Sequence, residues 1–205
     1  ELVNCRYSLS IFSISLMSSV NLYAISLSFI NAQIALPTFQ AVHKPHTTTS
    51  GTPENPLGDQ IISATATNIA WNYSMGYRFT PQVNGTITQL GGYFVGTKTV
   101  RLWQRSNTNF LGSVSVSSTN SWSYADLSSS VSVTAGTEYI VAVNLAGSGA
   151  SYKSRWSGPH TYGNILVSAS CYRGNHNSDS YPSWDQLNST TAMYGMADIT
   201  FIPDE

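Results

Sequence analysis

Acidic residues are the first candidates for chemistry in this chain, because hydrolysis of a glycosidic bond needs two carboxyl groups that flank it. Asp179 and Asp185 lie six residues apart in a polar segment and form the best pair. Their oxygens are equally suited to holding a structural Ca²⁺ ion. The small number of carboxyl groups argues against a glycoside hydrolase. The other carboxyl groups of the part expected to fold belong to Asp59, Asp126, Glu138, Asp198, Asp204 and Glu205.

Histidines and nucleophiles give no stronger sign of catalysis. A serine or cysteine nucleophile needs a base beside it, typically at a G-x-S-x-G turn, and the sequence contains no such turn. His43 and His46 flank a proline, where a metal-binding helical pair cannot form. His160 and His176 fall in predicted loops. We therefore predict that the protein is not an enzyme and has no cofactor, with structural calcium as the one alternative.

Aromatic residues give a better signal, because they crowd the stretch after residue 150. Planar rings stack on the apolar faces of sugars, and ligand pockets combine apolar walls with a few placed polar groups. Aromatic rings also fill sandwich cores, and we expect that packing role for Trp103 and Trp122. The crowded aromatic residues are Tyr152, Trp156, Tyr162, Tyr172, Tyr181 and Trp184. The predicted ligand-binding residues are Tyr152, Arg155, Trp156, Tyr181, Trp184 and Asp185.

The elements that must position these side chains are short β-strands. Apolar and polar residues alternate in stretches such as Ser113-Val-Ser-Val116, which places one row of side chains in a core and the other in water. Turn residues recur about every ten positions, which predicts an all-β antiparallel β-sandwich of the jelly-roll or Ig-like kind. The predicted strands cover residues 60–66, 76–80, 85–94, 98–104, 110–116, 121–126, 130–134, 138–144, 151–156, 164–170 and 192–201.

Short elements between residues 76 and 143 occur in an order that resembles a known family. They are Gly76-Tyr-Arg-Phe-Thr-Pro-Gln-Val-Asn-Gly85, Ile87-Thr88, Val100-Arg-Leu-Trp103, Leu111-Gly-Ser113, Trp122 and Thr134-Ala-Gly-Thr-Glu-Tyr139. This order resembles a bacterial domain of unknown function of the DUF4082 type. The resemblance implies a secreted sandwich attached to carbohydrate-active or adhesive proteins, with Glu138 in a structural turn. It implies no catalytic residues and gives no guide after Leu145.

Charged residues are scarce, at 9% of the chain against a usual value of about 25%. The formal net charge of −1 argues against a nucleic-acid partner, because such proteins gather Lys and Arg on one face. The nearest basic cluster is Lys98, Arg101 and Arg105. Positions 99, 101, 103 and 105 share one face of a predicted strand, so we expect an outward polar row there rather than a phosphate site.

The first part of the chain predicts export. Residues 1–32 contain Arg6, an apolar stretch interrupted by serines, and a small residue, Ala32, and together they resemble a signal peptide. A membrane anchor and a retained apolar N-terminal arm are the alternatives. Residues 33–59, rich in Pro and Thr, predict a linker, and residues 60–205 a single sandwich domain. We expect Cys171 to be a buried small apolar residue, with a Cys5–Cys171 disulfide as the alternative.

Two functions agree with these features. The first is a non-catalytic module, secreted or at the cell surface, that binds a glycan or cell-wall polymer. The second is a structural or adhesive surface or filament subunit. In that case residues 8–36 are retained, and they mediate self-assembly by completing a neighbouring subunit's sheet.

Overall fold

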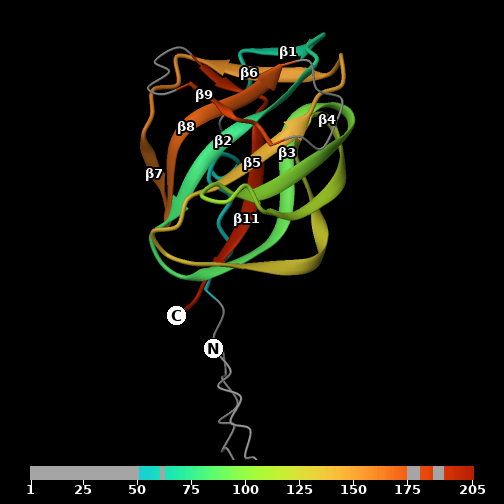
Figure 1. Cartoon of the computed structure of the whole chain (residues 1–205). Coiled ribbons are helices and arrows are strands. Elements are labelled where there is room, and N and C mark those ends of the chain that lie inside the picture. Colours follow the sequence, from blue (N-terminus) through green and yellow to red (C-terminus); the bar gives the residue numbers. More distant parts are fainter. Residues whose placement is uncertain (1–50, 61–62, 175–180, 187–191) are drawn as a thin grey trace, which may run out of the picture. The chain divides into compact units, whose positions relative to one another are not determined.

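The computed structural model describes residues 51–60, 63–174, 181–186 and 192–205. There the chain forms antiparallel strands joined by turns (Figure 1), which confirms the predicted all-β sandwich. None of these residues forms a helix long and apolar enough to cross a membrane. The strands are β1 (Ala66–Ile69), β2 (Tyr73–Pro81), β3 (Gly85–Gln104), β4 (Phe110–Val133), β5 (Tyr139–Asn144), β6 (Ala150–Ser154), β7 (His160–Tyr162), β8 (Ile165–Gly174), β9 (Trp184–Gln186), β10 (Ala192–Tyr194) and β11 (Ala197–Pro203).

The strands form two sheets. The larger runs in the order β11-β3-β5-β2-β8-β7, with β4 paired to β3 and β9 paired to β8. The first half of β3 pairs with β11 and its second half with β5, so the sheet curls and β11 contacts β2 across the core. The smaller sheet has the order β1-β6-β10, and its strands β1 and β6 lie at the top of Figure 1.

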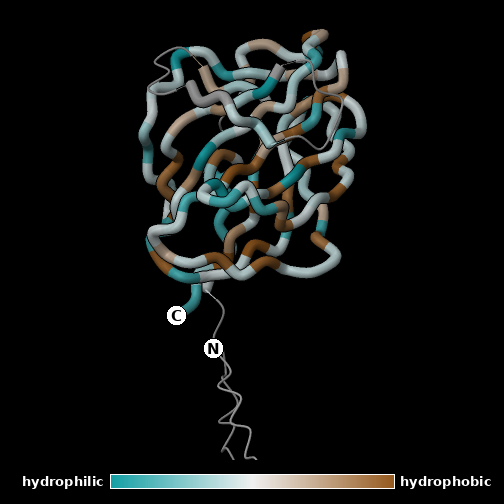
Figure 2. The backbone as a smooth tube through the Cα atoms, viewed as in Figure 1, coloured by the Kyte–Doolittle hydropathy of each residue, from teal (hydrophilic) through white to brown (hydrophobic). Residues whose placement is uncertain are grey.

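The core follows from the two-residue period of the strands. In β2 the side chains of Met75, Tyr77 and Phe79 face inward and are at most 5% exposed. Phe94 of β3 and Phe201 of β11 belong to the same cluster and are fully buried. Figure 2 shows hydrophobic residues spread along the strands between polar ones.

Strands β3 and β4 are longer than predicted. β3 joins two predicted strands and β4 joins three, so Gly96 and Asn120 lie inside strands instead of ending them. Both residues have positive φ, at 90° and 66°. Shifts in the register of the β3–β4 ladder, such as the one between Phe94 and Val95, mark bulges that bend the long hairpin. Gly and Asn are also typical turn residues, which is why the sequence predicts separate strands here.

The predicted outward polar row on β3 is wrong. Arg101 is 8% exposed and Trp103 only 2% exposed. Trp103 packs with Ile140 and Cys171 in a second, smaller core on the outer face of the sheet. The ring of Tyr181 closes this core, with its centroid 6.1 Å from that of Trp103. Arg101 and Trp103 do lie on one face of the strand, but both faces of this part of the sheet are covered.

The segment Gly51–Asp59, which we call the strap, is part of the sandwich rather than a linker. Glu54 forms an antiparallel bridge with Phe201, with N···O distances of 2.8 and 2.9 Å, and Leu57 is fully buried. The prediction that the domain begins at residue 60 is therefore wrong. The Pro and Thr content of the strap resembles that of a linker, but burial of Leu57 attaches the strap to the sandwich.

Smaller differences concern strand ends and cysteines. β1 begins six residues later than the start of the predicted strand, and β7 and β9 were not predicted. His160 consequently lies in a strand instead of a loop, and its side chain is exposed. Cys171 is fully buried, as predicted. Several predictions fall outside the described residues, namely those for residues 1–50 with Cys5, His43 and His46, and those for His176 and Asp179.

Candidate functional site

An aromatic hollow lies where β10 meets β2 and β8, and we call it the aromatic cleft. Its volume is about 260 Å³. Four of its five lining residues are half-buried aromatic rings, and the fifth, Met75, is 5% exposed. None of them carries a charge, so the cleft is suited to the apolar face of a ligand. The lining residues are Trp71, Tyr73, Met75, Tyr172 and Tyr194.

The rings of the aromatic cleft form two edge-to-face pairs. The centroids of Trp71 and Tyr194 are 5.7 Å apart with an interplanar angle of 60°. Those of Tyr73 and Tyr172 are 6.0 Å apart at 70°. Tyr152 extends the first pair, with its ring 5.7 Å from Trp71 and 6.1 Å from Tyr194. Rings in such arrangements support one another and keep fixed orientations without a ligand.

Strand register brings these residues together. Tyr172 of β8 lies directly opposite Met75 of β2, and Tyr194 of β10 lies opposite Tyr152 of β6. The backbone N–H of Tyr194 donates to Oγ of Ser170 at 3.1 Å, which ties the smaller sheet to β8. The cleft is thus built on rigid strands of two sheets, and its walls are preorganised.

The six predicted ligand-binding residues do not form one site. Tyr152 borders the aromatic cleft, whereas Arg155 is exposed after β6 with φ of 58°. Trp156 is 5% exposed and donates from Nε1 to the hydroxyl of Tyr162 at 3.3 Å, so its prediction as a ligand-binding residue is wrong. Tyr181 lies in a separate pocket described below. Trp184 and Asp185 belong to β9, and their side chains lie outside the described part of the chain.

Sequence reasoning missed Trp71, Tyr73 and Tyr194. Trp71 and Tyr194 are 123 residues apart in the sequence, and no local pattern links them. The available signal was the period of two, because Trp71 and Tyr73 lie on the same face as Met75, Tyr77 and Phe79 and extend that inward-facing row toward the start of β2. Nothing in the sequence showed that β10 lies beside it.

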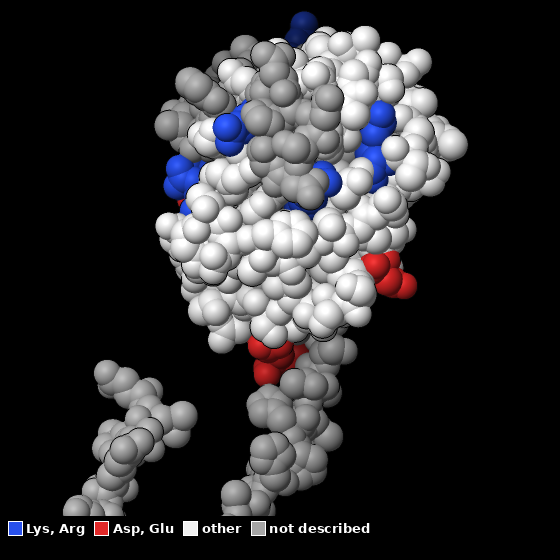
Figure 3. Space-filling view, turned by 45° about the vertical axis from the view of Figure 1, so that its right-hand side comes forward, with Lys and Arg blue, Asp and Glu red and all other residues white. Residues whose placement is uncertain are grey.

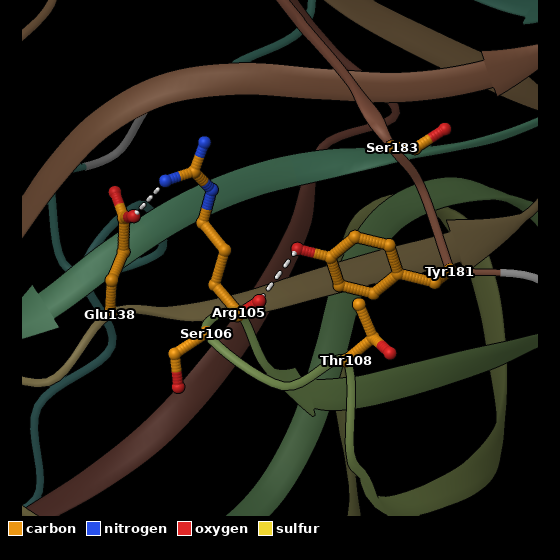
Figure 4. Close-up of a pocket in the computed structure, with 6 residues that line it drawn as sticks. All are labelled: Arg105, Ser106, Thr108, Glu138, Tyr181 and Ser183. Carbon is orange, nitrogen blue, oxygen red and sulfur yellow. Dashed lines mark hydrogen bonds and ion pairs between the residues drawn. The ribbon is translucent and has the colours of Figure 1, made fainter.

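A second, polar pocket of about 380 Å³ lies beside the loop that joins β3 to β4. Figure 4 shows Arg105 and Glu138 pointing toward each other, with the Tyr181 hydroxyl directed at the backbone of Arg105. The Arg105 Nη1–Glu138 Oε2 distance is 2.7 Å, and Nε of Arg78 lies 3.5 Å from Glu138 Oε1. Glu138 thus lies between two arginines, Arg78 and Arg105. The pocket is lined by Arg105, Ser106, Thr108, Glu138, Tyr181 and Ser183.

A buried carboxylate, Asp198 of β11, holds the strap on the sandwich. It accepts hydrogen bonds from the hydroxyls of Tyr77 and Tyr124, both at 2.8 Å. The strap donates from the N–H of Gly58 at 2.9 Å and from that of Leu57 at 3.3 Å. Burial raises the pKa of Asp198 to about 6, although these hydrogen bonds act in the opposite direction. Asp198 is fully buried, so its geometry assigns it a structural role.

The described residues offer little to a metal ion. Within them, no group of three or more His, Cys, Asp or Glu side chains gathers in one place. The calcium alternative depended on Asp179, which lies outside those residues, and on the undescribed side chain of Asp185.

Comparison with known proteins identifies the family. No curated protein matched the chain. The model of a family described as "Domain of unknown function (DUF4082)" matches residues 61–194, which are well over half of the 205 residues. The match extends past the resemblance seen between residues 76 and 143, and it includes β10 and all five residues that line the aromatic cleft. The chain therefore belongs to the DUF4082 family.

Proposed function

We propose that the protein is a non-catalytic extracellular module, secreted or at the cell surface, that binds carbohydrate in the aromatic cleft. The observation that carries this proposal is the uncharged hollow lined by four half-buried rings and Met75. An apolar sugar face stacks on such rings, and tyrosine hydroxyls are able to form hydrogen bonds with sugar hydroxyls. A glycan or cell-wall polymer of neutral sugars is the ligand class that this chemistry favours.

The surface charge agrees with a neutral ligand. White, uncharged atoms cover most of the face seen in Figure 3, and Lys and Arg atoms occur in separate small groups. A nucleic acid needs a continuous basic surface, because neutralising its phosphates supplies most of the affinity. We therefore do not propose a nucleic-acid partner.

Trp71→Ala is expected to weaken glycan binding at least about tenfold, or about 1.4 kcal/mol. The substitution removes one wall of the aromatic cleft, and aromatic anchors in such sites carry a large share of binding energy. A glycan array identifies the ligand, and calorimetric titration with that ligand measures the affinity of the wild type and the variant.

The matched control is Trp122→Ala. Trp122 is also half-buried and also packs on a tyrosine, with its ring 5.7 Å from that of Tyr93, but it does not line the cleft. Its variant should bind as the wild type does. Equal losses in the two variants, or no binding of the wild type to any glycan on the array, would refute the proposal.

A second function is favoured by the free edge of β4. Among the described residues this strand of 24 residues pairs only with β3. Its sequence contains one charged residue, Asp126, and no proline, so it lacks two of the usual features that block strand addition. We propose as the alternative that residues 8–36 of another copy add to this edge, which would make the protein an assembling surface or filament subunit.

The mature N-terminus separates the two functions. If the alternative holds, mass spectrometry of the exported protein should find residues 8–36 retained, and light scattering should show oligomers of the full chain. The same chain starting at Gln33 should then be monomeric. A mature protein that begins near Gln33 would exclude the assembly function and leave carbohydrate binding unaffected.

A further inference from the structure

Thr108 has a backbone conformation that its side chain disfavours. It lies in the loop of residues 105–109 between β3 and β4, and its φ is 56°. The loop is closed by the N–H of Gln104, which donates to the carbonyl of Asn109 at 2.9 Å. A β-branched residue in the left-handed region is an outlier, and Gly is the usual residue in that conformation. Backbone strain of this kind is typical of functional positions.

The strained residue belongs to the polar pocket. Thr108 lines it together with the hydroxyl residues Ser106 and Ser183, and the ring of Tyr181 forms a further wall (Figure 4). Asparagine tolerates positive φ and occupies the positions on both sides, Asn107 and Asn109. The threonine at this position therefore strains the backbone, and it places a particular side chain in the pocket.

The charged groups of the pocket are fixed in place and still accessible. The Arg105 side chain is 38% exposed and that of Glu138 is 27% exposed, although the two form a 2.7 Å ion pair. Arg78 lies on the other side of Glu138, with a side chain only 9% exposed, and holds its carboxylate from the interior. The pocket thus presents a guanidinium donor, a carboxylate acceptor and hydroxyls next to one another.

We propose that the polar pocket is a second ligand site, which binds neighbouring hydroxyls of a neutral sugar, and that Thr108 contacts this ligand. One sugar hydroxyl donates to Glu138 while its neighbour accepts from Arg105, and the ring of Tyr181 faces the sugar. The carboxylate of Glu138 would repel an anionic ligand.

This second site is separate from the aromatic cleft. Tyr73 of the cleft and Phe79, which lies level with Gln104 across β5, are six residues apart on β2. At about 3.3 Å per residue the two sites are roughly 20 Å apart along the strands. Each site can therefore be changed without altering the other.

The test measures binding and stability of Thr108→Gly. Calorimetric or NMR titrations use the methyl glycosides of glucose, galactose and mannose as probes, with the full chain as wild type, Thr108→Gly and Trp71→Ala. Thr108→Gly is expected to lower the affinity for the bound glycoside at least about tenfold. Its Tm should be no lower than that of the wild type, because Gly relieves the strain. Trp71→Ala should keep binding at the polar pocket.

Ala146→Gly is the matched control for strain. Ala146 also has positive φ, 39°, and lies exposed in a loop away from the pocket. This variant should keep wild-type affinity. The proposal is overturned if Thr108→Gly binds as the wild type does, if its Tm falls, or if the wild type binds none of the glycosides. Binding that Trp71→Ala abolishes and Thr108→Gly preserves would assign the sugar to the aromatic cleft alone.

Discussion

Asp198→Ala is expected to lower the free energy of unfolding at pH 7 by about 3 kcal/mol. The substitution leaves four donors without their acceptor, namely the hydroxyls of Tyr77 and Tyr124 and the strap N–H groups of Leu57 and Gly58. Each unsatisfied buried donor costs about 1–3 kcal/mol. Removing the carboxylate also removes the cost of burying its charge, so the expected loss stays below the sum for four donors. Denaturant unfolding followed by tryptophan fluorescence measures this loss.

The control for this stability measurement is Asp126→Ala. Asp126 also accepts a side-chain hydrogen bond, from Nε2 of Gln89 at 2.8 Å, but this bond lies at the surface. Its loss should change the free energy of unfolding by less than about 0.5 kcal/mol. If Asp198→Ala costs no more than Asp126→Ala, the carboxylate does not fasten the strap. Faster proteolysis within residues 51–59 in the Asp198 variant would locate the damage at that segment.

The stability difference between the wild type and Asp198→Ala should grow as the pH falls from 7 to 4. Burial raises the pKa of Asp198 from 3.8 to about 6 in the folded protein. Between these values the folded protein holds a proton that the unfolded chain has released. Proton binding by Asp198 therefore adds to the free energy of unfolding in full below pH 3.8, and this addition is lost as the pH rises through 6. The shift corresponds to about 3 kcal/mol.

Unfolding curves at pH 4, 5, 6 and 7 test this pH dependence. Taking the difference between the wild type and Asp198→Ala removes the titration of every group that behaves alike in both proteins. A difference that stays constant, or that shrinks toward pH 4, would show that the hydrogen bonds to Asp198 outweigh the cost of burying its charge.

The candidate sites were predictable only in part. The sequence pointed to aromatic residues after position 150, and of these Tyr172 lines the aromatic cleft and Tyr152 borders it. It also marked Trp156, which the structure buries, because an aromatic residue between polar neighbours has the same pattern whether it faces a ligand or a core. Asp198 was visible as one of the carboxylates of the chain, but its burial depends on the strap and on Tyr77, which lie far away in the sequence.

The sequence by itself determined the all-β sandwich, the alternation of exposed and inward-facing residues in Ser113-Val-Ser-Val116, and the family to which the chain belongs. These features are local, because a period of two and the order of short elements are properties of neighbouring residues. Only the tertiary structure decided that β10 meets β2 to form the aromatic cleft, and that Trp103 is covered on the outer face of β3. Alternation specifies which side chains share a face, but it does not specify what covers that face. The partner segment lies more than a hundred residues away in the first case, and contact between them depends on how the whole sheet curls.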